Sequence, residues 1–221
     1  MIKVILCDDH ALIRRGIRDT LADAADIEVI GEAGDYGELR GLMRSLAAGS
    51  PDGHAIRCDV LVLDINLPGR SGLDVMHVLK DEGSPVKVLV VSMYPEDQYA
   101  IRALRAGAYG YVNKGGDPQL IVQAVRTVAQ GRKYVTPEIA QMLVESLTAP
   151  VPEHAHDKLS DRELQTLVMI ASGKRLSDIA EQLTLSPKTV SVYRARVLEK
   201  LGLQNNSELT VYAIRNGLVG E

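Results

Sequence analysis

Short apolar runs, rich in valine, leucine and isoleucine, alternate five times with longer helical patterns in residues 1–130 of this 221-residue chain. The runs predict strands over residues 3–7, 28–32, 60–64, 87–92 and 110–112. The patterns that follow them predict helices near residues 11–24, 36–47, 73–81, 96–106 and 118–130. Two of the runs, 60–63 and 88–91, are apolar at every position, as expected of strands buried on both faces of a parallel sheet. The alternation therefore predicts an α/β domain with a doubly wound, five-stranded parallel sheet.

The rest of the chain shows helical patterns alone. Residues 136–147 predict a helix that opens on Thr-Pro-Glu, and residues 148–157, with two prolines, predict a linker. Four helices are predicted beyond them. The first begins at the capping box of residues 160–163, and the others cover residues 177–183, 187–201 and 207–216. We therefore expect a domain over 1–130, a helix and linker over 131–157, and an all-α, four-helix domain over 158–221.

Composition excludes several classes of protein. Hydrophobic residues make up 46% of the chain, but no run approaches the ~18 residues that span a bilayer. The N-terminus enters a strand pattern at once, where a secretory signal would need a basic segment and a longer apolar core. We therefore expect a cytoplasmic protein with no membrane partner. Cys7 and Cys58 are too few for a disulfide scaffold or a zinc site, and we interpret both as reduced, buried residues.

The formal net charge of −4 argues weakly against nucleic-acid binding, but this charge is unevenly distributed. Residues 150–221 carry nine lysines and arginines against nine aspartates and glutamates, so the acidic excess lies earlier in the chain. Any DNA-binding surface in the last third must therefore be a local basic stripe.

Five polar residues end or follow the predicted strands. Asp8 and Asp9 come directly after the first strand, and Asp64 ends the third. Ser92 ends the fourth strand, and Lys114 follows the fifth. In a doubly wound sheet these positions share one edge, where three carboxylates repel one another unless a cation such as Mg²⁺ lies between them. With a hydroxyl and an ammonium, they supply the groups that bind a phosphoryl group.

Each of these residues also has an ordinary structural interpretation. The Asp8-Asp9 pair is typical of a turn that caps a helix, Ser92 of a strand-end cap and Lys114 of a solvated charge. Their shared position at one edge of the predicted sheet favours a phosphoryl-binding site over these separate roles.

The same residues form part of a family pattern. The chain resembles the receiver domain of two-component response regulators over residues 1–130, on the motifs Asp8-Asp9-His10, Asp64-Ile-Asn-Leu-Pro-Gly69, Ser71-Gly72, Ser92 and Gly107-Ala-Tyr-Gly-Tyr-Val-Asn-Lys114. The resemblance implies that Asp64 accepts a phosphoryl group from a sensor histidine kinase. It also implies that Mg²⁺ is held by Asp8, Asp9, Asp64 and the main-chain carbonyl of Asn66.

Three further roles follow from the resemblance. Lys114 would pair with the phosphoryl group, and Ser92 would hydrogen-bond to it after transfer. Tyr111 matches the switch aromatic that turns inward when the serine moves, although an ordinary strand aromatic is the alternative. One feature departs from the family, because Asp64 lies 55 residues after Asp9, farther than receivers usually have it. The excess falls on residues 47–57, which predict an elongated surface loop, with a partner-specific contact as the alternative.

The predicted helix over residues 187–201 has two faces. The residues expected to pack on the preceding helices are Val190, Tyr193, Val197 and Leu201. The opposite face carries the small residues Ser191, Val192 and Ala195. The residues that flank them are Lys188, Thr189, Arg194, Arg196 and Lys200. Such a helix can bring small side chains to major-groove base edges while its cations meet phosphates, although an isolated helix of this kind would more often be a solvated basic face.

The segment from Leu159 to Leu203 resembles the LuxR-type helix-turn-helix, which with the receiver resembles the NarL/FixJ family and, in its C-terminal part, the UvrY/GacA-like branch. The resemblance implies a transcription regulator rather than an enzyme. It places Ser191, Val192 and Ala195 nearest the bases and the flanking residues, among them Lys188 and Lys200, at the DNA backbone. The implied partners are the kinase, promoter DNA, RNA polymerase and, after phosphorylation, a second copy of the chain.

Two functions of other classes remain as alternatives. A Mg²⁺-dependent phosphatase of haloacid-dehalogenase type would need Asp-x-Asp at its nucleophile, but this chain has Asn66 two residues after Asp64. A signalling adaptor would use the C-terminal domain to bind protein only, which a DNA mobility-shift assay would distinguish.

Overall fold

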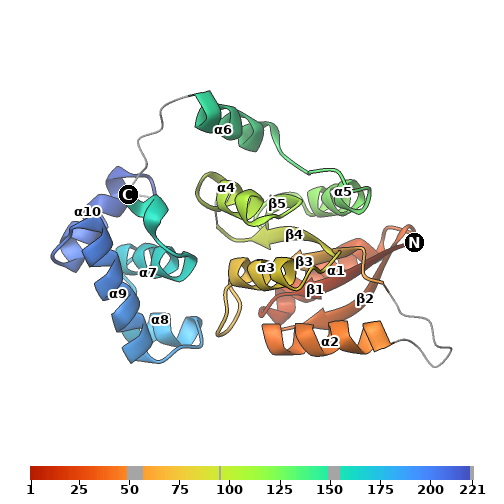
Figure 1. Cartoon of the computed structure of the whole chain (residues 1–221), viewed down its shortest axis with the longest axis horizontal. Coiled ribbons are helices and arrows are strands. Elements are labelled where there is room, and N and C mark those ends of the chain that lie inside the picture. The colour runs from red at the N-terminus through yellow and green to blue at the C-terminus, as the bar shows by residue number, and fades with distance from the viewer. Residues whose placement is uncertain (49–56, 95, 149–154, 220–221) are drawn as a thin grey trace. The chain divides into compact units, whose positions relative to one another are not determined.

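The computed structural model describes the backbone of residues 1–48, 57–94, 96–148 and 155–219, and the chain divides into two compact units, Met1–Glu145 and Ser146–Glu221. The first unit combines a sheet with helices, and the described part of the second is helical (Figure 1). The predicted fold class is therefore confirmed for both units.

Five parallel strands form the sheet of the first unit, in the order β2-β1-β3-β4-β5. They are β1 (Ile2–Cys7), β2 (Ile27–Ala33), β3 (Val60–Leu63), β4 (Lys87–Ser92) and β5 (Gly110–Asn113). The chain adds β2 on one side of β1 and then returns to add β3 on the other side. The strand order therefore reverses between β1 and β3, and in open α/β sheets ligands bind in the crevice outside the carboxyl ends of the strands at this point.

A helix follows each strand, and both faces of the sheet are covered. The helices are α1 (Ala11–Ala22), α2 (Tyr36–Ala48), α3 (Gly72–Asp81), α4 (Glu96–Ala106) and α5 (Pro118–Ala129). α1 and α5 contact each other and bury Leu21 and Val125 in a cluster with Val62 of β3. Leu61 and Leu63, whose side chains alternate with that of Val62, are also fully buried. This burial on both faces explains why the strands are continuously apolar.

The end of the first unit returns to the sheet. Tyr134 pairs with Gly110 of β5 before α6 (Pro137–Thr148) begins. The loop predicted over residues 47–57 starts later than expected, because Ala47 and Ala48 belong to the last turn of α2. Residues 49–56, on which most of that prediction falls, lie outside the described residues.

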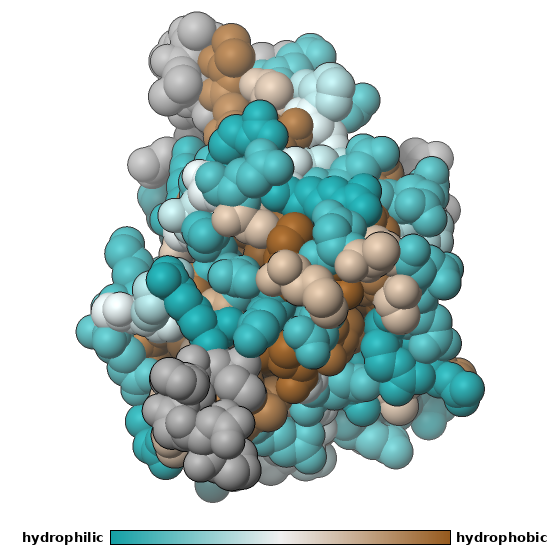
Figure 2. All heavy atoms as spheres, turned by 90° about the vertical axis from the view of Figure 1, so that its right-hand side faces the viewer, coloured by the Kyte–Doolittle hydropathy of each residue, from teal (hydrophilic) through white to brown (hydrophobic). Residues whose placement is uncertain are grey.

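Figure 2 shows the face of the first unit that lies on the right of Figure 1, where a band of hydrophobic side chains is surrounded by hydrophilic ones. The N-terminus and the start of β1 lie on this side, and the other strands run parallel to β1. The carboxyl ends of the strands, with their acidic residues, therefore lie at the opposite end of the sheet.

The two cysteines are free thiols within the fold. Cys7 is buried and Cys58 is half-buried, beside a cavity of about 240 Å³ that is also lined by Met43, Pro85 and Val86. Burial raises the pKa of each thiol to about 12. Both are therefore neutral thiols near pH 7. The expectation of a buried residue is confirmed for Cys7, whereas Cys58 is only half-buried.

The second unit packs its helices around a small core. They are a 3₁₀ turn, η1 (Ala155–Lys158), then α7 (Asp161–Ala171), α8 (Leu176–Gln182), α9 (Pro187–Leu201) and α10 (Asn206–Arg215). The predicted capping box at Ser160 and Glu163 is present at the start of α7. Of the predicted linker, residues 149–154 lie outside the described residues. In the part of the chain that the structure describes, no helix has both the length and the hydropathy that a bilayer span requires.

Candidate phosphorylation site and DNA-binding helix

The acidic cluster lies where the strand order reverses. Asp8 follows Cys7, the last residue of β1, and Asp64 follows Leu63, the last residue of β3. Because Cys7 and Leu63 are paired in register, the two aspartates leave the sheet side by side. Asp8, Asp9, His10 and Asp64 each offer a ligand atom within 4.8 Å of the others. Asp8 and Asp64 are buried, with 4% and 3% of their surface exposed.

Lys114 connects the two buried carboxylates. Its Nζ atom lies 2.7 Å from Oδ2 of Asp8 and 2.8 Å from Oδ2 of Asp64, and its side chain is only 3% exposed. Burial raises the pKa of Asp64 to about 6; Lys114 opposes this rise and the neighbouring Asp8 adds to it. The cluster therefore holds more negative charge than one ammonium compensates, and it favours any ligand that brings further positive charge.

The cluster also has acceptor atoms to offer to a cation. Oδ2 of Asp8 and Oδ1 of Asp9 are buried, the first 2.7 Å from the Lys114 ammonium and the second 2.5 Å from Nδ1 of His10. Buried carboxylate oxygens of this kind suit a hard divalent cation, which takes oxygen ligands. The residues present therefore fit the cation that the sequence predicts.

Ser92 and Tyr111 are linked through the main chain of Tyr94. Ser92 is fully buried at the end of β4, and its Oγ accepts a hydrogen bond from the Tyr94 amide at 3.3 Å. The Tyr94 carbonyl accepts hydrogen bonds from the Tyr111 hydroxyl at 2.7 Å and from the Asn113 side chain at 3.0 Å. Tyr111 is fully buried, and its role as a switch aromatic, with an ordinary strand aromatic as the alternative, stays a prediction.

The side chain of Asn66 reaches the same turn. The Tyr94 hydroxyl and the Asn66 amide lie 3.2–3.3 Å apart, so the segment after β3 is hydrogen-bonded to the segment after β4. Two strand-end segments around Asp64 are thus held together by side chains that lie 28 residues apart in the sequence.

Ser71 and Gly72 support the segment that follows Asp64. Ser71 forms a capping box with Asp74 at the start of α3. The Gly72 amide donates to the carbonyl of Ile65 at 2.8 Å, and a Cβ atom at Gly72 would lie 2.1 Å from the carbonyl oxygen of Asp64. Only glycine allows this close approach of α3 to the backbone of Asp64.

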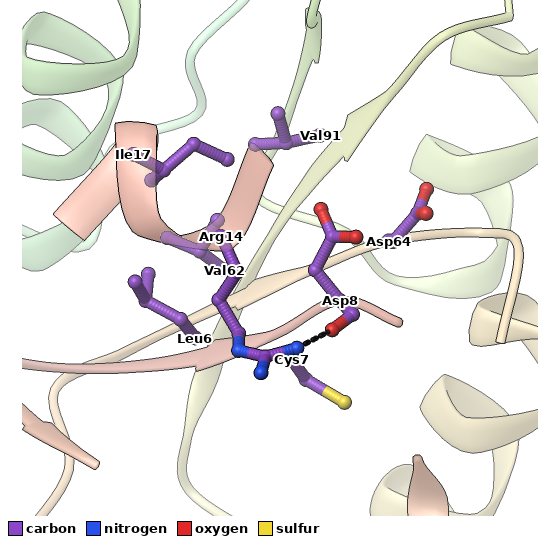
Figure 3. A pocket seen from close by; sticks show the side chains of 8 residues that line it. All are labelled: Leu6, Cys7, Asp8, Arg14, Ile17, Val62, Asp64 and Val91. Carbon is purple, nitrogen blue, oxygen red and sulfur yellow. Dashed lines mark hydrogen bonds between the residues drawn. The ribbon is translucent and has the colours of Figure 1, made fainter. Parts of the chain in front are cut away.

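Arg14 lies beneath the acidic turn (Figure 3). Its side chain extends from α1 toward the main chain of Asp8, where Nη1 donates a hydrogen bond to the carbonyl oxygen. Its Nε atom donates to Oε2 of Glu32 on β2 at 3.1 Å. This arginine therefore joins the turn after β1 to the neighbouring strand.

The predicted DNA-binding face of α9 is exposed. Ser191, Val192 and Ala195 are all solvent-accessible, whereas Val190 and Val197 on the other face are fully buried. Ser186 caps the helix by accepting from the Thr189 amide, with Pro187 at the first helical position. One detail differs from the expectation: Leu198 is buried, and Leu201 is only half-buried.

Two of the predicted phosphate contacts are already engaged in side-chain interactions. The Lys200 ammonium lies 2.6 Å from Oε2 of Glu163 and donates to the carbonyl of Lys158 at 3.3 Å. Nε of Arg194 donates to the Asn206 side chain at 2.5 Å. Lys188 and Arg196 are exposed, with no hydrogen bond or ion pair to the described residues. That these four residues contact DNA stays a prediction, and the structure favours the last two.

Two family models match this chain: the response regulator receiver domain over residues 4–126 and the luxR family of bacterial regulatory proteins over residues 157–213. The chain is 38% identical to response regulator GacA of Pseudomonas aeruginosa over 220 residues, which cover 99% of this chain and 98% of that protein. It is also 38% identical to response regulator UvrY of Escherichia coli over 219 residues, which cover 99% and 96% of the two chains. The chain belongs to the NarL/FixJ family of response regulators.

Solved structures agree with this assignment. The response regulator RcsB of Salmonella typhimurium is 27% identical, with a TM-score of 0.56, over 96% of this chain and 98% of that one. RcsB of Salmonella enterica serovar Typhimurium, bound to promoter rprA in the presence of phosphomimetic BeF3-, shares the fold at 24% identity, with a TM-score of 0.62 over 96% and 97% of the two chains. The predicted family and the GacA and UvrY resemblance are therefore confirmed.

The structure brings together all the receiver residues that the sequence predicts. One cluster holds Asp8, Asp9, Asp64 and Lys114. The hydrogen bonds of Tyr94 connect the segments that carry Asn66, Ser92 and Tyr111. Sequence reasoning missed Tyr94, Asn113 and Arg14. Asn113 and Tyr94 carry the same signal as the residues found, since they end β5 and follow β4. Arg14 has a weaker signal: long side chains in a helix point back toward its N-terminus, here toward the acidic turn.

Proposed function

We propose that the receiver domain is phosphorylated on Asp64 by a sensor histidine kinase and that this phosphorylation controls promoter binding by α9. One observation carries the proposal: the Asp64 carboxylate lies within 2.8 Å of the Lys114 ammonium and beside Asp8, at the edge of the sheet where ligands bind. An oxygen of Asp64 forms a bond to phosphorus while the bond from phosphorus to the kinase histidine nitrogen breaks. Lys114 can stabilise the negative charge that develops during this transfer, since its ammonium already contacts the Asp64 carboxylate.

Mg²⁺ is the cation that we propose for the cluster. Asp8, Asp9, Asp64 and the main-chain carbonyl of Asn66 would hold it, and it would neutralise charge on the phosphoryl oxygens during transfer. The support is the grouping of Asp8, Asp9 and Asp64, which each offer a carboxylate oxygen within 4.8 Å of the others.

The link from Asp64 to the rest of the domain runs through Ser92 and Tyr94. A phosphoryl group on Asp64 offers an acceptor to the Ser92 hydroxyl, and the Tyr94 amide now donates to that same Ser92 oxygen. A movement of Ser92 therefore carries the Tyr94 main chain with it, and the hydroxyl of Tyr111 follows the Tyr94 carbonyl. We propose that this changes the surface around β4 and β5 and shifts the population toward a DNA-binding dimer, with RNA polymerase as a further partner at the promoter.

The test compares Asp64→Asn with Asp81→Asn, a change at an exposed aspartate at the end of α3. Each protein is incubated with acetyl phosphate and Mg²⁺. Intact-mass measurement then reports phosphorylation, and a mobility-shift assay with genomic promoter fragments reports DNA binding. We expect the wild type and Asp81→Asn to be phosphorylated and to bind DNA more tightly, and Asp64→Asn to do neither. Phosphorylation of a folded Asp64→Asn protein, or equal stimulation of its DNA binding, would refute the proposal.

A further inference from the structure

We propose that Arg14 is a positioning residue for the cation-binding turn: it fixes the peptide group between Asp8 and Asp9 and thereby sets the direction of both carboxylates. This inference rests on the Mg²⁺ site of the proposed function. Arg14 is outside the acidic cluster itself, and its guanidinium faces the main chain of Asp8 rather than the carboxylate (Figure 3).

The main chain of Asp8 is held at both of its polar groups. The amide of Asp8 donates to the carbonyl of Ala33 on β2 at 3.0 Å, and the carbonyl of Asp8 accepts from Nη1 of Arg14. A peptide group is planar, so its carbonyl oxygen and the next Cα lie in one plane. Fixing the Asp8 carbonyl therefore fixes where Asp9 leaves the turn.

Arg14 is itself held in place by β2. Its Nε donates to Oε2 of Glu32 at 3.1 Å, while Oε1 of Glu32 accepts from Nη1 of Arg18 at 3.2 Å. The side chains of Arg14 and Glu32 are 20% and 31% exposed. A guanidinium presents several donors in a fixed planar arrangement, so it can reach Glu32 and the Asp8 carbonyl together. An ammonium at this position is a point charge and cannot reproduce both contacts at their present geometry.

Electrostatics alone predicts the opposite effect of Arg14. A positive charge near the cluster competes with a divalent cation, so its removal would strengthen cation binding. Glu32 compensates only part of this charge, because it contacts the guanidinium of Arg14 and that of Arg18. The two explanations thus predict opposite changes in Mg²⁺ affinity when the Arg14 side chain is removed. A substitution that keeps the positive charge but loses the planar guanidinium separates them.

The experiment measures Mg²⁺ affinity by isothermal titration calorimetry on the full chain. Arg14→Lys keeps the charge, Arg14→Met removes it, and Arg15→Met is the matched control, because Arg15 lies on the same helix, 71% exposed, and pairs with Asp19. We expect both Arg14 variants to bind Mg²⁺ roughly tenfold more weakly, the lower end of the effect of losing a group that orients metal ligands. We expect Arg15→Met to stay within about twofold of the wild type, because its charge faces solvent.

A second measurement is the dependence of the acetyl phosphate reaction on Mg²⁺. The Arg14 variants should need a higher Mg²⁺ concentration for half-maximal rate and should approach the wild-type rate at saturation. Unchanged affinity in Arg14→Lys, or tighter binding in Arg14→Met, would overturn the inference. If Arg14→Met does not fold by circular dichroism, Arg14→Lys alone decides. The wild-type protein tests the proposed function separately. If it binds Mg²⁺ but is not phosphorylated at Asp64, the proposed function is contradicted. The Mg²⁺ affinities of the Arg14 variants still decide the role of Arg14.

Discussion

The hydroxyl of Tyr111 donates a 2.7 Å hydrogen bond to the main-chain carbonyl of Tyr94. Tyr94 follows β4 and Tyr111 lies within β5, and the amide of the same Tyr94 donates to Ser92. The Tyr111 side chain on β5 is thereby hydrogen-bonded to the turn after β4. The proposed switch would use this arrangement, because Tyr111 can keep its bond only while the Tyr94 carbonyl stays within reach.

Tyr111→Phe should weaken the coupling between phosphorylation and DNA binding. The ring stays buried, but its bond to Tyr94 is lost, and we expect a stability loss of about 1 kcal/mol, typical of one intramolecular hydrogen bond. Phosphorylation by acetyl phosphate should be retained, whereas the ratio of DNA affinities with and without the phosphodonor should fall. Tyr109→Phe is the control, since it removes a hydroxyl beside the same strand; equal ratios for the two variants would contradict the role of Tyr111.

Gly72→Ala and Gly41→Ala should change stability in opposite directions. A Cβ at Gly72 would meet the Asp64 carbonyl oxygen at 2.1 Å, whereas a Cβ at Gly41 in α2 meets no atom within 4 Å. We expect Gly72→Ala to lose roughly 1–3 kcal/mol from forced displacement of the backbone and to be phosphorylated more slowly. Gly41→Ala should gain about 0.5–1 kcal/mol from helix propensity. Urea unfolding of the full chain measures both, and a stable Gly72→Ala protein with normal phosphorylation would argue against the close packing.

The sheet and its acidic cluster could be predicted because both depend on local patterns. The continuous apolar run of β3 indicates burial on both faces, and the carboxyl end of a strand is where a functional aspartate such as Asp64 is expected. The contacts of Arg14 and Lys200 could not be predicted in this way. Arg14 bonds to Glu32 across 18 residues and Lys200 to Glu163 across 37, and these pairs depend on how the elements pack rather than on any sequence period.

Thr184→Asn should stabilise the second unit. Thr184, in the turn between α8 and α9, has φ +53°, a left-handed conformation that costs free energy for a β-branched residue. Asparagine adopts this conformation more readily than threonine does. Glycine would also adopt it, but glycine increases the conformational entropy of the unfolded chain more than asparagine does. We expect a gain of roughly 0.5–1 kcal/mol in thermal or urea unfolding, a fraction of the cost of the left-handed conformation. Thr210→Asn, within α10, should give no such gain, because Thr210 has an ordinary helical backbone.

The stability of the second unit should fall at acidic pH through Glu163. Burial opposes ionisation of this carboxyl, but the hydrogen bonds from Lys200 and Ser160 outweigh it and hold its pKa below its usual value. A carboxyl with a lowered folded pKa stabilises the fold above its unfolded pKa, and this contribution is lost as pH falls through the folded pKa. The stability difference between wild type and Glu163→Gln in urea should therefore be larger at pH 6 than at pH 3. A difference that does not change with pH would contradict the lowered pKa.

Lys200→Met and Arg196→Ala should weaken DNA binding for different reasons. The Lys200 ammonium contacts Glu163, whose side chain is 3% exposed, so its removal leaves a buried carboxylate without its cation. We expect Lys200→Met to lower the free energy of unfolding by about 2 kcal/mol, typical of a hydrogen bond to a charged group.

Arg196→Ala should leave the free energy of unfolding unchanged, because Arg196 is exposed on α9. If it contacts a phosphate, its loss should reduce the slope of log affinity against log salt concentration by about one. Lys200→Met should leave that slope unchanged, since its ammonium is already paired within the domain. Mobility-shift titrations at several salt concentrations, with urea unfolding of the same proteins, separate the two effects. A reduced slope in Lys200→Met would show that this lysine leaves Glu163 for the DNA backbone, and the sequence-based prediction of a phosphate contact would then hold after all.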